Sequence, residues 1–315
     1  MENNYITKFT NRFNDFAKSN LFKALGVFGL FVISKTILKS LLWVKKYFLS
    51  FERDFKKLYG DGWVIITGGS EGIGKSLAEE FAKRGFKILL ISRTEETLKK
   101  TSDELSKIQG ANQIEYLAFD FSQDYDKTTI DELRKKMSPY HDCSILINNV
   151  GMTQNSLFNN MSDDYIRKMI NTNVNSLVWM TRIVIDGMLK RNDRSLIVRS
   201  GSVAHYLRVK FKSIYVASKT FMDGFMCSLA RETDRIDYTY MEIGPISTKL
   251  NMNSYPGQLS SPKPFAQSAM THLGKYFYSG IWWRHGLTND LAMSNDCLLE
   301  YEKRNAESSI KEREN

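Results

Sequence analysis

The stretch from Trp63 to Gly85 restricts the folds open to this chain more than any other. It begins with a short apolar, β-branched run, which is typical of a buried strand. Four glycines follow within seven residues: Gly68, Gly69, Gly72 and Gly74. The next residues have helical apolar spacing, and a helix N-terminus after glycines can bind a phosphate with its backbone N–H groups. The spacing is G-x-x-x-G-x-G and not the G-x-G-x-x-G fingerprint, so an ordinary glycine-rich turn is the alternative.

Beyond this turn, short apolar runs alternate with segments of helical spacing. We expect strands at 63–66, 86–91, 114–119, 144–147, 195–199 and 238–243, and helices at 94–109, 131–137, 163–189 and 215–232. This alternation predicts an α/β fold with a single doubly wound (Rossmann) parallel sheet and helices on both faces. Ligands of such sheets bind at the carboxyl ends of the strands.

A different pattern precedes the sheet, in the apolar segment 21–49. Its longest uncharged run, 24–34, is shorter than the roughly 20 residues of a clean membrane span, and Lys35 and Lys39 interrupt the remainder of the segment. Three interpretations remain: a transmembrane helix, an amphipathic helix in the membrane plane, and a soluble helix packed on the domain. Membrane association is the one we favour. Basic residues after the segment predict that the globular part faces the cytosol.

The composition of the chain limits the kinds of partner that we expect it to bind. The chain has 315 residues and a net charge of +9, which suits phosphate cofactors, anionic acyl carriers and membrane surfaces. No nucleic-acid recognition module is present, so nucleic acid is not an expected partner. The three cysteines lie far apart and have no metal-ligand spacing, so we expect neither a disulfide framework nor a metal site.

The end of the second expected strand bears on the cofactor. An acidic residue there would bind a ribose hydroxyl, but the sequence has Ser92 and Arg93, with no acid before Glu95. A hydroxyl and a guanidinium suit a 2′-phosphate, so NADPH is favoured over NADH. The alternative for Arg93 is a solvated loop charge.

Tyr215 and Lys219 lie four residues apart at the start of an expected helix and therefore share a face. A nearby ammonium favours tyrosinate, so we expect Lys219 to lower the pKa of Tyr215 and make it a proton donor and acceptor. Ser202 lies 13 residues before Tyr215, and Asn173 lies on the preceding long helix. Each of these residues alone is more often structural than catalytic.

Taken together, these motifs resemble the short-chain dehydrogenase/reductase family. They are TGGSEGIG (67–74), NNVG (148–151), NTNVNS around Asn173, SGSVA around Ser202, YVASK (215–219) and GPIST (244–248). The flanking residues resemble its very-long-chain 3-oxoacyl-CoA reductase / 17β-hydroxysteroid dehydrogenase type 12 branch, including hydroxysteroid dehydrogenase-like proteins. That branch also carries a membrane segment before the glycine turn.

The resemblance implies roles for matching residues. Tyr215 would protonate a substrate carbonyl, Lys219 would hold the nicotinamide ribose, and Ser202 would orient the carbonyl. Asn173 would hold a water that links Lys219 to solvent. Contacts with NADPH or NADP are implied for these residues: Gly68, Ser70, Gly72, Ile73, Gly74, Ser92, Arg93, Asp120, Asn149, Gly151, Tyr215, Lys219, Ile246 and Thr248.

The resemblance also suggests a division of the chain. We expect a polar segment at 1–20, a membrane-associated helix at 21–50, the NADP-binding catalytic domain at 51–255, a substrate lid and helical region at 256–300, and a charged tail at 301–315. The match becomes thin after Asn251, which leaves the substrate more open than the reaction. The basic loop HYLRVKFKS (205–213) could meet an acyl-CoA phosphate or a membrane, or be solvated.

These observations predict a membrane-anchored, NADPH-dependent carbonyl reductase that acts on a long-chain 3-oxoacyl-CoA. A hydroxysteroid or other lipid ketone is the alternative substrate, and a scaffold subunit of a membrane complex with little turnover is the alternative of another class. The branch implies the endoplasmic reticulum, with a mitochondrial membrane as the other option. Homo-oligomers and membrane-complex partners both stay open.

Overall fold

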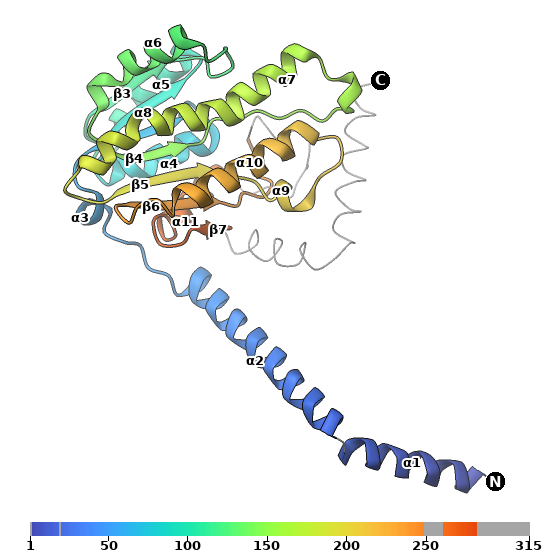
Figure 1. Ribbon diagram of the computed structural model, residues 1–315. Helices are drawn as coiled ribbons and strands as arrows, with labels where there is room; N and C mark the ends of the chain where they lie inside the picture. The colour runs from blue at the N-terminus through green and yellow to red at the C-terminus, as the bar shows by residue number, and fades with distance from the viewer. Residues whose placement is uncertain (1, 19, 249–260, 282–315) are drawn as a thin grey trace. The chain divides into compact units, whose positions relative to one another are not determined.

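Seven parallel strands form one sheet in the order β3-β2-β1-β4-β5-β6-β7 (Figure 1). The computed structural model describes residues 2–18, 20–248 and 261–281. The strands are β1 Trp63–Thr67, β2 Lys87–Ser92, β3 Ile114–Ala118, β4 Cys143–Asn148, β5 Ser195–Ser200, β6 Ile236–Met241 and β7 Tyr278–Ser279. The strand order reverses between β1 and β4, which is where doubly wound sheets bind their ligands.

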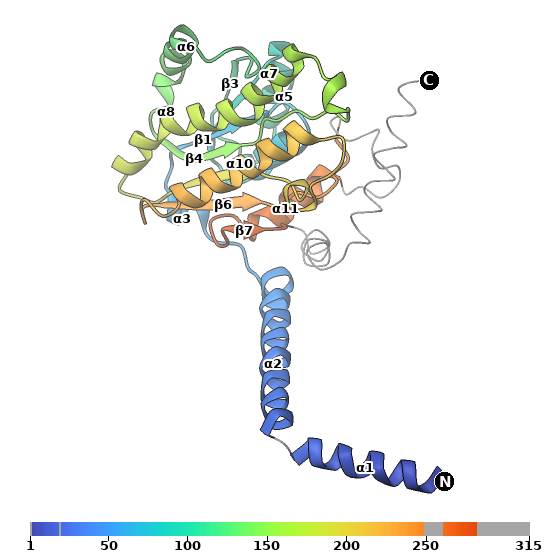
Figure 2. The same ribbon diagram turned by 45° about the vertical axis from the view of Figure 1, so that its right-hand side comes forward.

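Helices cover both faces of the sheet (Figure 2). The α-helices of the described domain are α3 Phe55–Tyr59, α4 Gly72–Lys83, α5 Glu95–Ser106, α6 Lys127–Met137, α7 Asp163–Ile170, α8 Ser176–Lys190, α9 Ala204–Leu207, α10 Ser213–Leu229 and α11 Pro262–Met270. Short 3₁₀ turns are η1 Ser138–Tyr140 and η2 Phe158–Asn160, and a π-helical turn, η3, covers Asn171–Asn175.

The core has two layers because the strand residues alternate between the faces. One apolar cluster joins α3, α4, α5 and α11 to strand residues such as Val64, Ile66 and Leu90. The other joins α6, α8 and α10 to the residues between them, such as Ile65 and Leu89. The predicted parallel sheet with helices on both faces is confirmed.

Two features differ from the sequence expectation. The long helix expected at 163–189 contains the π-helical turn η3, which carries Asn173; such turns occur most often at functional sites. The two-residue strand β7 was not predicted, because two residues are too few to show strand periodicity. Within the predicted region 256–300, the described residues form α11 and β7, whereas 256–260 and 282–300, like the expected tail 301–315, lie outside the described residues. The predicted division of the chain stays a prediction.

The chain divides into two units, residues 1–50 and 51–315. The first contains α1 Glu2–Lys18 and α2 Asn20–Phe48. Within α2, residues 22–48 have a mean hydropathy of 1.7, and the rest of the described structure buries none of the most apolar stretch. At 1.5 Å per residue, this helix is long enough to cross a bilayer. The predicted long apolar helix before the sheet is therefore present.

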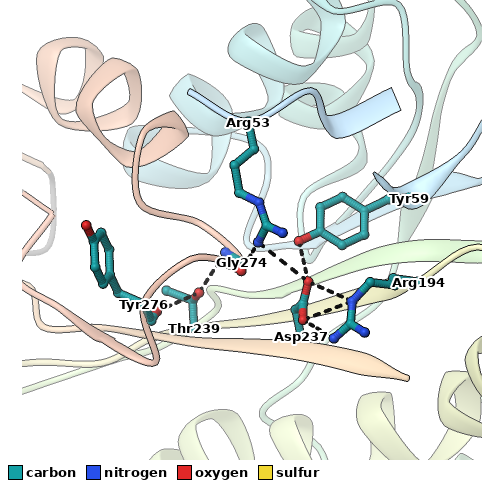
Figure 3. Close-up of polar contacts among 7 residues, drawn as sticks. All are labelled: Arg53, Tyr59, Arg194, Asp237, Thr239, Gly274 and Tyr276. Atoms are coloured by element: carbon teal, nitrogen blue, oxygen red, sulfur yellow. Dashed lines mark hydrogen bonds and ion pairs between the residues drawn. The ribbon is translucent and has the colours of Figure 1, made fainter. Parts of the chain in front are cut away.

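A polar cluster joins the first residues of the second unit to the amino end of β6 (Figure 3). The carboxylate of Asp237 accepts a hydrogen bond from the Tyr59 hydroxyl at 2.9 Å and pairs with Arg194 and Arg53. Arg53 also donates to the carbonyl of Gly274. The cluster thus joins the segment before β1 to the segment between α11 and β7.

Candidate active site

The glycine turn between β1 and α4 forms a cradle, a loop whose backbone can surround a phosphate. It needs three glycines, for two different reasons. Gly68 and Gly72 have positive φ angles of 64° and 59°, which side-chain-bearing residues rarely adopt. A Cβ on Gly74 would lie 2.2 Å from the carbonyl oxygen of Gly68, so the turn could not close against the helix. The Glu71 side chain makes no capping hydrogen bond to α4. This backbone fits the pyrophosphate of a dinucleotide.

The end of β2 forms the next part of the wall. The Ser70 hydroxyl donates to the Ser92 hydroxyl at 3.1 Å, which joins the glycine turn to this strand end. Arg93 is exposed and lines the same cavity as Asp120, whose carboxylate accepts from the backbone N–H and hydroxyl of Ser122. The cavity therefore carries a hydroxyl from the last residue of β2 and a guanidinium from the residue after it.

Asn149 joins the carboxyl ends of three strands. Its side-chain amide donates to the carbonyls of Thr67 and Gly68, at 3.2 and 3.1 Å. Its amide oxygen accepts from the Ser200 hydroxyl at 2.9 Å. Because β1, β4 and β5 meet here, Asn149 holds the edge of the sheet on which a cofactor would lie.

Asn173 is fully buried and holds the segment after β4. Its Oδ1 accepts from the Met152 N–H at 2.8 Å, and its Nδ2 donates to the Met152 carbonyl and to the Ser218 hydroxyl. A Cβ on Gly151 would lie 3.4 Å from Asn173 Oδ1 and 3.9 Å from Lys219 Nζ. The π-helical turn thus brings Asn173 close to Lys219. Asn173 and its hydrogen-bond partner Ser218 are 45 residues apart in the sequence.

Tyr215, Lys219 and Ser202 lie together at the carboxyl end of β5. Lys219 Nζ donates to the Ser200 carbonyl at 2.9 Å and lies 5.4 Å from the centre of the Tyr215 ring. The Ser202 hydroxyl makes a side-chain hydrogen bond with Tyr215. Lys219 and Ser202 are buried and Tyr215 is half-buried. A carbonyl beside Tyr215 and Ser202 would meet two hydroxyl donors.

The protonation behaviour of this pair differs from the sequence expectation. Burial raises the pKa of Tyr215, while the Ser202 hydrogen bond and the Arg199 charge act against that rise. The pKa of Lys219 lies well below its usual value, first because of burial and second because of repulsion from Arg199. The expected lowering of the Tyr215 pKa by Lys219 is therefore wrong for this structure, because desolvation outweighs the Ser202 hydrogen bond and the Arg199 charge.

One cavity of about 1080 Å³ contains most of the predicted site residues. They are Gly68, Ser70, Gly72, Ile73, Ser92, Arg93, Asp120, Asn149, Gly151, Ser202, Tyr215, Lys219, Ile246 and Thr248. Gly74 and Asn173 do not line it; they lie behind it and support the glycine turn and the 151–152 segment. The volume is at the upper end of ligand sites, so it suits a ligand as large as a dinucleotide.

Some residues of the site have little or no signal in the sequence. The Thr67 hydroxyl accepts from the N–H groups of Asn149 and Val150, and Ser218 bonds Asn173. Arg199 is fully buried, and its guanidinium donates to the carbonyl of Asn148. Thr67 and Ser218 lie within the motifs TGGSEGIG and YVASK but were not predicted as site residues. Arg199 stands out in the sequence only as a charged residue among the apolar residues of SLIVRS.

Comparisons with known proteins agree with this geometry. The family model for short chain dehydrogenase matches residues 62–259. A very-long-chain 3-oxoacyl-CoA reductase of Bos taurus is 34% identical over 246 residues, covering 76% of this chain and 77% of the relative. A putative steroid dehydrogenase 3 of Caenorhabditis elegans is 29% identical over 257 residues, covering 78% and 80%.

A solved structure of a short-chain dehydrogenase is also similar to this chain. A short-chain dehydrogenase from Sphingobium yanoikuyae in complex with NADPH has a TM-score of 0.61 and 25% identity, covering 66% of this chain and 82% of the other. The family model covers more than half of the chain, and the predicted motifs of that family line the cavity. The chain belongs to the short-chain dehydrogenase family and is an oxidoreductase of the NAD(P)-dependent kind.

Proposed function

We propose that this protein is a membrane-anchored reductase that uses NADPH to convert a long-chain 3-oxoacyl-CoA into the 3-hydroxyacyl-CoA. The observation that carries the proposal is the meeting of Ser202, Tyr215 and Lys219 in one cavity with the glycine cradle. The 34% identity with a very-long-chain 3-oxoacyl-CoA reductase over most of both chains supports the substrate class.

The roles of the residues follow from their positions. A bound nicotinamide would supply hydride to the carbonyl carbon. Tyr215 would donate the phenolic proton to the carbonyl oxygen, and its raised pKa keeps that proton in place at neutral pH. Ser202 would hydrogen-bond the same oxygen and stabilise its developing charge. Lys219 would bind the nicotinamide ribose, and Asn173 would support the segment beside Lys219.

NADPH is the proposed cofactor because of the end of β2. Arg93 lines the cavity beside Ser92 and is exposed, so it can turn toward a 2′-phosphate. Carboxylates that would repel that phosphate are absent from Ser92 to Thr94, and the first one, Glu95, begins α5. The NADPH bound to the structural relative supports this choice.

We propose that α2 anchors the protein in the endoplasmic reticulum membrane with the catalytic domain in the cytosol. The length and hydropathy of residues 22–48 support a span, and Lys45 and Lys46 in the last turn support a cytosolic side for the catalytic domain. Washing membranes with alkaline carbonate tests this: the full chain should stay in the pellet, and a variant lacking residues 1–50 should not. Release of the full chain would contradict the anchor.

The main experiment is an assay of the purified full-length protein in detergent. NADPH oxidation with a long-chain 3-oxoacyl-CoA supports the proposal. Oxidation only with a ketosteroid favours the second candidate, for which the putative steroid dehydrogenase 3 is the supporting relative. No oxidation with either, together with stoichiometric retention in a larger membrane assembly, would favour a scaffold.

A further inference from the structure

Arg199 is a charged residue where the fold expects an apolar one. It lies in β5, three residues before Ser202, and its side chain is fully buried. The strand residues Leu196, Ile197 and Val198 before it are buried as well. Within the described part of the chain, no carboxylate pairs with Arg199. Burying an unpaired guanidinium costs free energy, so contacts with other polar groups must offset that cost.

The guanidinium contacts two parts of the active site. Its Nη1 donates to the carbonyl of Asn148 at 2.8 Å and to that of Val150 at 3.3 Å, on either side of Asn149. Its Nε contacts Met222 Sδ at 2.9 Å, on the helix that also carries Tyr215 and Lys219. Nη2 has no hydrogen-bond partner among the described residues. Arg199 therefore lies between the turn after β4 and α10.

Arg199 keeps its charge in this position. Burial lowers the pKa of its guanidinium from the usual 12.5, but the delocalised charge of the planar guanidinium keeps arginines protonated in proteins. Its charge disfavours the ammonium form of Lys219 and favours the tyrosinate form of Tyr215. Arg199 therefore supplies a positive charge that acts on both residues.

The other ionisable groups around Tyr215 and Lys219 do not cancel the effect of the Arg199 charge on their pKa values. Tyr240 on β6 donates to the Lys219 carbonyl, and His205 contacts the Tyr240 ring. Lys212 Nζ lies 5.9 Å from the Tyr215 ring centre. Two carboxylates lie in this region: Asp223 on α10 accepts from the Tyr278 hydroxyl and raises the pKa of Tyr240, and Glu242 accepts from the Tyr206 hydroxyl. Arg199 is the cation that acts on both Tyr215 and Lys219.

We propose that Arg199 is a positioning residue of this active site: its buried guanidinium holds the turn after β4 and presents a fixed positive charge to Tyr215 and Lys219. This inference rests on the proposed reduction. When Tyr215 gives its proton to the carbonyl oxygen and the hydride goes to the carbon, a tyrosinate remains, and Arg199 stabilises that anion.

Two variants separate the charge from the hydrogen bonds. Arg199→Gln keeps an N–H donor and removes the charge, whereas Arg199→Lys loses the forked donor. The measurements are kcat for carbonyl reduction against pH and the Kd of NADPH. In Arg199→Gln, the loss of activity at alkaline pH should move to higher pH, by at least about half a pH unit, or threefold in the acid constant.

Arg199→Lys should bind NADPH several-fold more weakly, because a single ammonium holds the carbonyls of Asn148 and Val150 less well than the forked guanidinium. Arg182→Gln, which removes an exposed arginine of α8, is the matched control and should change neither quantity. An unmoved or lowered limb in Arg199→Gln overturns the proposal. If that variant does not fold, the Lys variant decides, and wild-type binding of NADPH by Arg199→Lys overturns the proposal.

A second readout separates this proposal from the proposed function. The tyrosinate absorbance of a protein minus that of its Tyr215→Phe variant isolates the titration of Tyr215, and it requires no turnover. If the wild type reduces no carbonyl, the proposed function fails, but the Tyr215 step should still lie at higher pH in Arg199→Gln. A step at the same or lower pH would overturn the role of Arg199.

Discussion

The ligand-binding site at the carboxyl ends of the strands has two halves, which are built in different ways. Around β1 and β2, the cradle consists of backbone and short side chains from 68–74 and 92–93, two neighbouring segments. Around β4 and β5, the site consists of side chains from 148–152, 171–175, 199–202 and 215–219. Those four segments are separated in sequence and meet only because the sheet and α10 bring them together.

The difference shows how each half depends on its surroundings. In the first half, steric freedom of glycine decides the function, since a Cβ at Gly74 would meet a backbone oxygen. In the second half, burial decides it, because desolvation changes the pKa of both Tyr215 and Lys219. Changes in the first half should therefore affect cofactor binding, and changes in the second should affect proton transfer.

Removal of the proton donor should have the largest effect. Tyr215→Phe should lower kcat by about 10²- to 10⁴-fold, the usual contribution of a general acid, and leave the Kd of NADPH nearly unchanged. Steady-state kinetics and cofactor fluorescence measure the two quantities. Wild-type turnover in this variant would contradict the assignment of Tyr215 as proton donor. An equally large loss of cofactor binding would show that the two halves of the site do not act separately.

Gly74→Ala should do the reverse and mainly damage cofactor binding. Its Cβ would lie 2.2 Å from the Gly68 carbonyl oxygen, so the turn must shift, and we expect a loss of about 1–3 kcal/mol of stability. Gly224→Ala in α10 is the control: nothing lies within 4 Å of its Cβ, and alanine should stabilise the helix by roughly 0.5–1 kcal/mol. Thermal unfolding and NADPH titration are the measurements, and wild-type binding by Gly74→Ala would contradict the cradle.

Arg93→Gln should have a smaller effect, limited to the choice of cofactor. The loss of one charge-assisted hydrogen bond to a 2′-phosphate should weaken NADPH about tenfold and leave NADH unchanged. Lys99→Gln, an exposed charge of α5 outside the cavity, is the control. Equal weakening of both cofactors would show that Arg93 does not contact the phosphate.

The pH dependence should be the mildest effect near neutrality. Burial raises the pKa of Tyr215 above its usual value of 10.0, and the protonated phenol is the proton donor. Carbonyl reduction should therefore persist from neutral into alkaline pH and fall only as pH rises through the raised pKa. The reverse oxidation needs tyrosinate and should increase with pH over that range. Profiles of kcat in both directions test this, and an alkaline limb below pH 10 would contradict it.

Much of the fold was predictable because its signals are local. The strands from β1 to β6 are rich in apolar residues, although Glu115, Arg199 and Asp237 lie inside three of them. Their observed bounds differ from the predicted ones by a few residues. The motifs of the family are short and ordered along the chain, so the residues of the cavity could be named in advance. The strand β7 could not, since it depends on pairing with β6 at Tyr240 and Met241.

The sequence alone predicted the parallel sheet, the glycine turn and the set of Asn173, Ser202, Tyr215 and Lys219, because periodicity and motif spacing lie within the chain itself. Only the tertiary structure decided how those groups behave. It placed Gly74 and Asn173 behind the cavity, and it put Arg199 near Tyr215 and Lys219. The expected lowering of the Tyr215 pKa became a rise, because desolvation depends on everything packed around a group and cannot be read from its neighbours in sequence.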